Sequence, residues 1–254
     1  MATLQDRVLI ITGSSSGIGL TTAAAALSQG ARVLGVDIRP APALLTENAN
    51  YVFFHADLCG ESTPQQVVAA CIDAFGGTID GLLNVAGVMD LNQSVDSLSD
   101  TTWQRCMTIN LTAPVRMMRA VIPIMRAQKN GSIVNVSSKA GLSGAVAGVA
   151  YTASKHGLIG ATKNVAWRFK NENIRCNAVC PGGVFETGIH NSIDPTAMDG
   201  EATKIMQPIY QLHGTGGLDI QPETVAQCIL FLVSAQSGGI NGAIIPIDNA
   251  WSTI

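Results

Sequence analysis

Short apolar runs rich in β-branched residues alternate with longer segments of helical character along the chain. The apolar runs are continuous instead of alternating with polar residues, which is typical of parallel strands buried on both faces. Strands that alternate with helices predict right-handed βαβ units and an α/β fold with a doubly wound parallel sheet of about seven strands. The predicted strands are 8–12, 32–37, 51–55, 81–84, 132–137, 174–179 and 243–247, and the predicted helices are 18–29, 64–75, 100–127, 151–171 and 222–234.

One stretch, residues 187–217, departs from this alternation. It contains Pro195, Pro208 and several glycines, and its apolar residues are scattered without a clear period. A long, weakly patterned insertion in an otherwise regular chain usually forms a lid or a binding segment. We therefore predict a substrate lid over 187–217 within one domain, 1–254.

Composition excludes several classes of function. The chain has 254 residues, a formal charge of −3 and only 13% charged residues, so it lacks the basic footprint of a nucleic-acid-binding protein. The apolar run Val8–Ile11 is far shorter than the roughly 18 residues of a membrane span. We expect a soluble, cytoplasmic protein with no nucleic-acid or membrane partner. The six cysteines have no metal-ligand spacing, and we predict no metal site.

A glycine-rich turn separates the first predicted strand from the first predicted helix. Its sequence runs Thr-Gly-Ser-Ser-Ser-Gly-Ile-Gly from Thr12 to Gly19. Glycines allow a tight turn and a close approach of a pyrophosphate, and the helix N-terminus offers free N–H groups to the anion. The turn predicts a dinucleotide site that includes Gly13, Ser15, Ser16, Gly17, Ile18 and Gly19.

Asp37 ends the second predicted strand, about 20 residues after the glycines. A carboxylate there can accept hydrogen bonds from the adenosine ribose and would repel a 2′-phosphate. Arg39 lies two residues further on and could soften that preference. We predict NAD as the cofactor, with NADP less favoured.

Tyr151 and Lys155 are four residues apart in a predicted helix, so their side chains share one face. A phenol alone is a poor acid or base at neutral pH, because its ordinary pKa is about 10. A cation about 5 Å away contributes roughly 3 kcal/mol in favour of the phenolate at an effective dielectric near 20. We expect Lys155 to lower the pKa of Tyr151 by about two units.

Further motifs follow in a fixed order. Asp57-Leu58 follows the third predicted strand, Asn84-Val85-Ala86-Gly87 ends the fourth, and Pro181-Gly182 follows the sixth. With the glycine-rich turn, these motifs resemble those of the short-chain dehydrogenase/reductase family over nearly the whole chain. The resemblance implies a Rossmann-type domain that binds NAD or NADP. The residues that match the family's catalytic tetrad are Asn110, Ser138, Tyr151 and Lys155.

The resemblance implies a role for each of these residues. Tyr151 would exchange a proton with the substrate oxygen, and Lys155 would hold the nicotinamide ribose. Ser138 would hydrogen-bond the substrate oxygen as charge develops; Ser137 is the neighbouring alternative, but the spacing favours Ser138. Asn110 would anchor a water path to Lys155.

The family pattern also implies the rest of the cofactor site. The segment after Pro181-Gly182 is one residue longer than usual, and residues 246–250 differ from the family's Asp-Gly-Gly motif. We expect a homodimer or homotetramer, as is common in the family. The implied cofactor contacts beyond the glycine-rich turn and Asp37 are Asp57, Leu58, Asn84, Ala86, Gly87, Tyr151, Lys155, Pro181, Gly182, Val184 and Thr187.

The residues expected around the substrate are mostly small or apolar. The wall 139–150 is rich in Ala, Gly and Val, and 187–217 contains no arginine to clamp a small anion. We predict a bulky apolar secondary alcohol or ketone, such as a terpenoid, steroid-like or polyketide-derived compound. Diffuse similarity to fungal secondary-metabolite dehydrogenases points the same way. The predicted substrate contacts are Ser138, Tyr151, Val146 and His190.

NAD favours oxidation, since cellular NAD pools are largely oxidised. Three alternatives stay open: an acyl-carrier or small-ketone reductase, an isomerase or dehydratase on the same fold, and a non-catalytic dinucleotide-binding scaffold.

Overall fold

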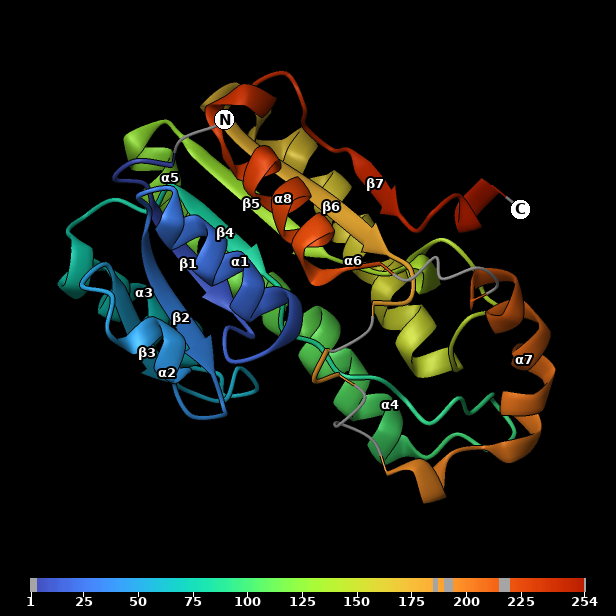
Figure 1. Ribbon diagram of the computed structural model, residues 1–254. Coiled ribbons are helices and arrows are strands. Elements are labelled where there is room, and N and C mark those ends of the chain that lie inside the picture. The colour runs from blue at the N-terminus through green and yellow to red at the C-terminus, as the bar shows by residue number, and fades with distance from the viewer. Residues whose placement is uncertain (1–3, 185–186, 190–193, 215–219, 254) are drawn as a thin grey trace.

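The computed structural model describes residues 4–184, 187–189, 194–214 and 220–253. Within them the chain forms one parallel sheet in the order β3-β2-β1-β4-β5-β6-β7 (Figure 1). This confirms the predicted doubly wound sheet. The strands are β1 Val8–Thr12, β2 Arg32–Asp37, β3 Tyr51–His55, β4 Gly81–Asn84, β5 Gly131–Val136, β6 Ile174–Pro181 and β7 Ile244–Ile247.

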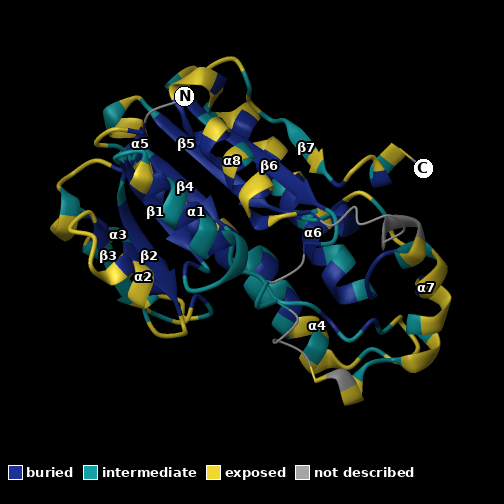
Figure 2. Cartoon of the chain, viewed as in Figure 1, coloured by how far each residue is buried: buried dark blue, intermediate teal, exposed yellow. Residues whose placement is uncertain are grey.

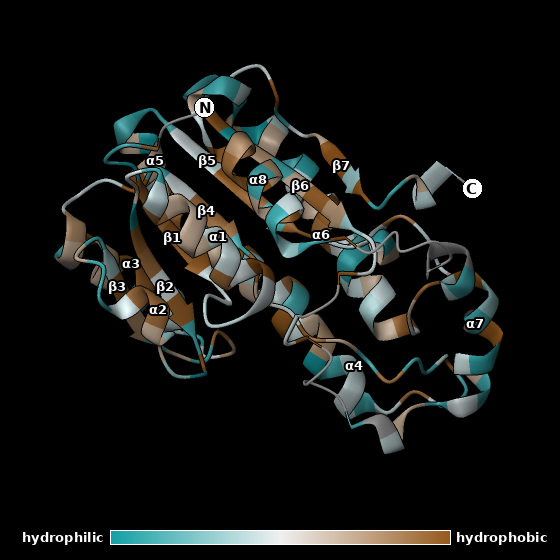
Figure 3. Cartoon of the chain, viewed as in Figure 1, coloured by the Kyte–Doolittle hydropathy of each residue, from teal (hydrophilic) through white to brown (hydrophobic). Residues whose placement is uncertain are grey.

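Helices cover both faces of the sheet. The helices α1 and α8 pack together on one face, and α3, α5 and α6 cover the other. The central strands are buried along their whole length (Figure 2), and apolar residues are frequent in them (Figure 3). Burial on both faces explains why their sequences read as continuous apolar runs. The helices are α1 Gly17–Ser28, α2 Ala43–Thr46, α3 Thr63–Phe75, α4 Asp100–Met107, α5 Ala113–Gln128, α6 Val149–Phe169, α7 Gly200–Gly214 and α8 Pro222–Val233.

The order of the strands reverses between β1 and β4. The chain runs outward from β1 to β2 and β3, then returns to place β4 on the other side of β1. Connections on the two sides of this point diverge at the carboxyl ends of the strands and leave a crevice there, where doubly wound sheets bind their ligands.

The predicted helix over 100–127 is wrong as a single regular α-helix. A π-helical turn, Thr108–Thr112, separates α4 from α5. Such a turn adds a residue to the helical repeat and is frequent at functional sites. Here it turns Asn110 inward, where its side chain is fully buried.

The predicted lid contains a helix that its sequence pattern did not indicate. α7 lies apart from the sheet, beside the loop that joins β4 to α4 (Figure 1). Two hydrogen bonds fix this position: the Asp199 N–H donates to the Leu91 carbonyl at 2.9 Å, and the Asn92 amide donates to Thr203 Oγ1 at 3.2 Å. Pro208 within α7 and its mixed composition hide the helical period.

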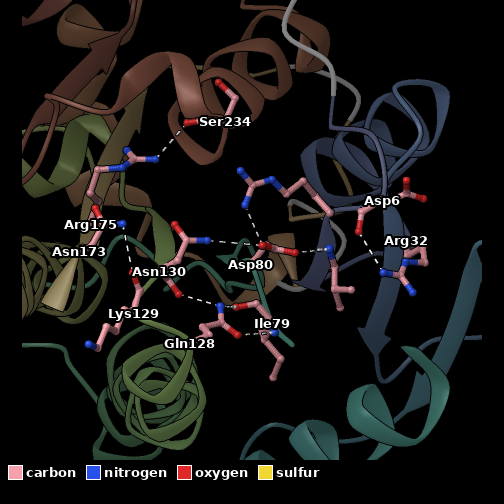
Figure 4. A network of polar contacts seen from close by, with 12 residues as sticks. Asp6, Arg32, Ile79, Asp80, Gln128, Lys129, Asn130, Asn173, Arg175 and Ser234 are labelled. Carbon is pink, nitrogen blue, oxygen red and sulfur yellow. Dashed lines mark hydrogen bonds and ion pairs between the residues drawn. The ribbon is translucent and has the colours of Figure 1, made fainter. Parts of the chain in front are cut away.

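A polar network joins elements at the opposite ends of the strands (Figure 4). Asp80, just before β4, accepts hydrogen bonds from Arg7 at 2.7 Å and from the Val8 backbone at 2.9 Å. The side-chain amide of Gln128, at the end of α5, accepts the Ile79 N–H at 3.2 Å and donates to the Ile79 carbonyl at 2.8 Å. These contacts tie together the starts of β1 and β4, at the edge of the sheet opposite the crevice.

Candidate active site

A cavity of about 820 Å³ lies at the carboxyl ends of the strands. It runs from the glycine-rich turn past the ends of β2, β4, β5 and β6 to α7. It therefore brings the predicted nucleotide site and the predicted proton-transfer residues into one space. Of the predicted residues, it is lined by Gly13, Ser16, Gly17, Ile18, Gly19, Asp37, Asp57, Leu58, Ala86, Gly87, Ser138, Val146, Tyr151, Lys155, Pro181, Gly182, Val184 and Thr187.

Three predicted residues are not among the lining side chains. The Ser15 backbone N–H donates to Asp37 at 3.0 Å. The Asn84 amide donates to Asn135 Oδ1 at 2.8 Å, inside the sheet. Asn110 lies behind Lys155 and is fully buried. His190 lies outside the described residues, so its substrate contact stays a prediction.

The geometry of the glycine-rich turn fits a dinucleotide pyrophosphate. Gly13 has φ +73°, and a β-carbon on it would lie 2.9 Å from the backbone of Ala86. A β-carbon on Gly19 would collide with the Gly13 carbonyl. No side chain caps the start of α1, and its first turn carries no acidic residue. The N–H groups and positive dipole end of α1 are therefore available to an anion.

Asp37 and Arg39 lie at the end of the cavity that is predicted to hold the adenosine. One Asp37 oxygen accepts the Ser15 N–H, and the other accepts the Arg39 N–H at 2.9 Å. The Arg39 guanidinium lies 3.5 Å from the same carboxylate and also donates to the Ser16 hydroxyl. A β-carbon on Gly188 would approach Arg39 Nη1 to 2.7 Å. Arg39 thus fills the space between the glycine-rich turn and the start of the predicted lid.

The predicted catalytic side chains Ser138, Tyr151 and Lys155 come from the turn just after β5 and from α6. α6 begins at Val149, so Tyr151 and Lys155 lie in its first two turns on one face. The ammonium nitrogen of Lys155 lies 5.5 Å from the centre of the Tyr151 ring and donates to the Val136 carbonyl at 2.9 Å. Ser138, just after β5, lies near enough to the Tyr151 hydroxyl to lower the pKa of the phenol. The three residues predicted from the motifs therefore converge.

The expected lowering of the Tyr151 pKa by Lys155 is wrong for this structure. Burial raises the pKa of Tyr151 to about 12, while the hydrogen bond to Ser138 lowers it and the nearby Asp90 raises it. Burial likewise lowers the pKa of Lys155 to about 8. Removal of both groups from water disfavours both charged forms, and this outweighs the attraction expected from spacing alone.

Asn110 fixes the backbone beside Lys155. Its amide nitrogen donates to the Val88 carbonyl at 2.9 Å and to Ser154 Oγ at 3.1 Å, and its oxygen accepts the Val88 N–H at 2.9 Å. A β-carbon on Gly87 would lie 3.3 Å from the Asn110 oxygen and 3.4 Å from the Lys155 nitrogen. Asn110 therefore determines where the 87–88 backbone lies, and its water path to Lys155 stays a prediction.

Asp90 is a site residue that the sequence did not reveal. It is 1% exposed, and its carboxylate accepts the backbone N–H groups of Asn92, Gly148 and Tyr151. Asp90 lies in a loop and belongs to none of the recognised motifs, so its sequence position alone does not predict contact with Gly148 and Tyr151. Asp90 caps the start of the helix that carries Tyr151.

The wall beyond Tyr151 is largely apolar, as expected. Val146 packs against Tyr151, and the Tyr210 hydroxyl donates to the Val146 carbonyl at 3.2 Å, which joins α7 to this wall. Trp251, near the C-terminus, was not recognised from the sequence as part of the wall. Lys139, the first residue of the predicted wall 139–150, is buried there as a cation among mostly apolar residues.

Comparison with known proteins agrees with this geometry. The family model described as short chain dehydrogenase matches residues 7–197. The chain belongs to the short-chain dehydrogenase family. It is 66% identical to asnovolin H dehydrogenase of Aspergillus novofumigatus and 65% identical to the short chain dehydrogenase adrF of Penicillium roqueforti, over the whole of both chains.

A solved structure shares the fold. The crystal structure of levodione reductase has a TM-score of 0.85 and 28% identity, covering 98% of each chain. This short-chain dehydrogenase is thus an oxidoreductase that uses a nicotinamide dinucleotide. The predicted likeness to fungal secondary-metabolite members is confirmed.

The described residues contain neither a membrane-spanning helix nor a cluster of metal ligands. In the described ranges, no helix is long and apolar enough to cross a membrane. No group of three or more His, Cys, Asp or Glu side chains in the same ranges could hold a metal ion.

Proposed function

We propose that this short-chain dehydrogenase oxidises a bulky, largely apolar secondary alcohol to a ketone with NAD. The observation that carries the proposal is the shared cavity: Ser138, Tyr151 and Lys155 line the same space as the glycine-rich turn. Beyond Tyr151 that space is bounded by apolar side chains from three separate parts of the chain, among them Val146, Met198 and Trp251.

Each residue has a distinct task. When bound, the nicotinamide dinucleotide supplies the hydride acceptor. Ser138 holds the substrate oxygen by a hydrogen bond, and Tyr151 removes the hydroxyl proton as general base. The Lys155 ammonium lies 5.5 Å from the centre of the Tyr151 ring, and its positive charge opposes the desolvation that raises the pKa of Tyr151 and disfavours the phenolate needed to accept this proton. Asn110 and Asp90 hold the backbone segments that orient Lys155 and Tyr151.

The adenosine end supports NAD over NADP. The Asp37 carboxylate lines the cavity at the end of β2, where it can accept ribose hydroxyls and repel a 2′-phosphate. Arg39 is engaged with Asp37 and Ser16. Because its guanidinium is already paired, Arg39 should attract the 2′-phosphate of NADP less strongly than an unpaired arginine would.

The substrate class rests on the wall and on the relatives. The cavity of about 820 Å³ has to hold the dinucleotide as well as the substrate, and its part beyond Tyr151 is bounded mainly by apolar side chains. One relative is named as a dehydrogenase of asnovolin H. We assign the substrate to fungal secondary metabolites of terpenoid, steroid-like or polyketide-derived type.

We also propose a homodimer or homotetramer. The long helices α5 and α6 carry exposed apolar side chains, including Val115 and the largely exposed Trp167. Exposed apolar side chains on long surface helices favour contacts between subunits. Sedimentation of the purified protein tests this directly.

The test of the function is a screen of bulky secondary alcohols with NAD and with NADP, followed by NADH or NADPH absorbance. Stoichiometric formation of NADH and ketone supports the proposal. Formation of an isomer or an alkene without net NADH would identify an isomerase or dehydratase instead.

A further inference from the structure

Lys139 is a buried cation in the substrate cavity that proton transfer does not use. It follows Ser138 directly and begins the 3-10 turn Lys139–Gly141. Its side chain lines the cavity, although the residue is only 5% exposed. A charged side chain therefore lies in a wall whose other members are mostly apolar.

The partners of Lys139 leave part of its ammonium unsatisfied. Its nitrogen donates to the Trp251 carbonyl at 3.0 Å and lies 5.8 Å from the centre of the Trp251 ring. No carboxylate among the described residues forms an ion pair with it. An ammonium has three N–H donors, so two remain without an acceptor from the described part of the chain.

The position of Trp251 keeps Lys139 at the substrate side of the cavity. Asn249 and Ala250 adopt φ +48° and +68° and turn the chain back after β7. Trp251 is buried against the cluster that contains Tyr151 and Val146. Lys139 is consequently held beside the cluster that contains Tyr151, with only 5% of its surface exposed.

A purely structural role accounts for only one of the three donors. Burying an ammonium is costly unless its charge and donors are satisfied. A neutral hydrogen-bond donor at this position would hold the Trp251 carbonyl without that cost. The charge and the two remaining donors are explained by a ligand with acceptor oxygens.

We propose that Lys139 binds a second oxygen of the substrate, a carbonyl-type acceptor carried by the apolar skeleton at some distance from the reacting carbinol. The inference rests on the proposed function, since it refines the substrate class of the same site. Ketones, esters and carboxylates share the required chemistry. Lys139 thereby selects oxygenated members among compounds of similar shape.

Equilibrium binding tests this inference independently of turnover. Two variants are compared, Tyr151→Phe and the double variant Tyr151→Phe/Lys139→Met. Each variant is loaded with NADH and titrated with a probe, and the fluorescence of the bound NADH reports probe binding. The one-oxygen probe is trans-2-decalone. The two-oxygen probes have the same skeleton with either a second ketone (trans-decalin diketones) or a carboxylate (decalone carboxylates). We expect the best two-oxygen probe to bind Tyr151→Phe about tenfold tighter than the decalone, and this preference to fall below about threefold without Lys139.

Further variants separate binding from folding. Lys139→Arg keeps the charge and should restore part of the preference, and Lys139→Gln replaces Lys139→Met if the latter unfolds early in a thermal melt. Lys163→Met removes an exposed lysine of α6 and should leave the preference intact. The carboxylate and ketone probes show which oxygen type is favoured.

Three results would overturn the proposal: no two-oxygen probe binds more tightly, the preference survives without Lys139, or all probes weaken equally. Failure of the alcohol screen with a positive binding result would contradict the proposed oxidation alone.

Discussion

The carboxylate of Asp90 accepts the backbone N–H of Tyr151 at 2.9 Å. Its other oxygen accepts the N–H of Gly148, the residue that caps α6. A negative charge at a helix N-terminus stabilises the helix through its dipole, and here it also fixes the backbone of the proposed general base. The orientation of Tyr151 thus depends on a loop that follows β4.

Replacement of Asp90 by Asn should reduce both stability and turnover. Asn keeps the shape, but one acceptor becomes an NH2 group that faces backbone N–H groups. We expect the free energy of unfolding to fall by about 1–3 kcal/mol, because buried donors lose their acceptor. We expect kcat to fall at least about tenfold, because Tyr151 is displaced. Denaturant unfolding and steady-state kinetics measure the two effects.

Asp96→Asn is the matched control, since Asp96 is exposed in the same loop. Equal behaviour of the two variants would contradict the role of Asp90.

Much of this arrangement could be predicted from local sequence. Continuous apolar strands, the glycine-rich turn and the Tyr151–Lys155 spacing depend on neighbouring residues, and the structure has all three features. Asp90 could not be found this way, because its partners lie 58 and 61 residues further along the chain.

The pKa of Tyr151 shows a second limit. Spacing indicates that a cation lies near the phenol, but burial depends on the whole fold. Desolvation by that fold raises the pKa that the lysine was expected to lower. The lid helix α7 was missed for a different reason, since Pro208 interrupts its periodicity.

The glycine-rich turn should tolerate no side chain at Gly19. Gly19→Ala places a methyl group against the Gly13 carbonyl and distorts the turn. We expect NAD affinity to fall at least about tenfold, equivalent to about 1.4 kcal/mol. Titration of NAD by calorimetry measures this loss.

Gly160→Ala provides the opposite control. Gly160 lies in the middle of α6, and a β-carbon there meets no atom within 4 Å. Alanine should stabilise the protein by about 0.5–1 kcal/mol through helix propensity. Similar losses of NAD affinity in both variants would contradict the steric account of the turn.

Buried Lys155 should make stability depend on pH. Its pKa falls from 10.5 to about 8 on folding, so between these values the unfolded chain binds a proton that the folded protein does not. Stability of the wild type therefore rises with pH across this window relative to Lys155→Met, by about 3 kcal/mol in total. Unfolding of both proteins at pH 8 and pH 10.5 measures the difference.

Lys163→Met, which removes an exposed lysine of the same helix, should show no such trend relative to the wild type. A wild type that loses stability relative to Lys155→Met over this range would refute the assignment.

Loss of the Asp37 carboxylate should weaken the discrimination against NADP. Asp37→Ser removes the charge that opposes a 2′-phosphate and releases Arg39 from its carboxylate partner. We expect the ratio of kcat/KM for NAD to that for NADP to fall at least about tenfold. Asp57→Ser, at the end of the next strand, is the comparison. An unchanged ratio in Asp37→Ser would show that another group sets the preference.

The most direct measurement is the NADH formed from the best bulky secondary alcohol by the wild type and by Tyr151→Phe, with NAD affinity determined for both. Removal of the phenol oxygen deletes the proposed base and leaves the ring in place. We expect kcat to fall by about 10²–10⁴-fold while NAD affinity stays within about twofold. Turnover by Tyr151→Phe close to that of the wild type would contradict it.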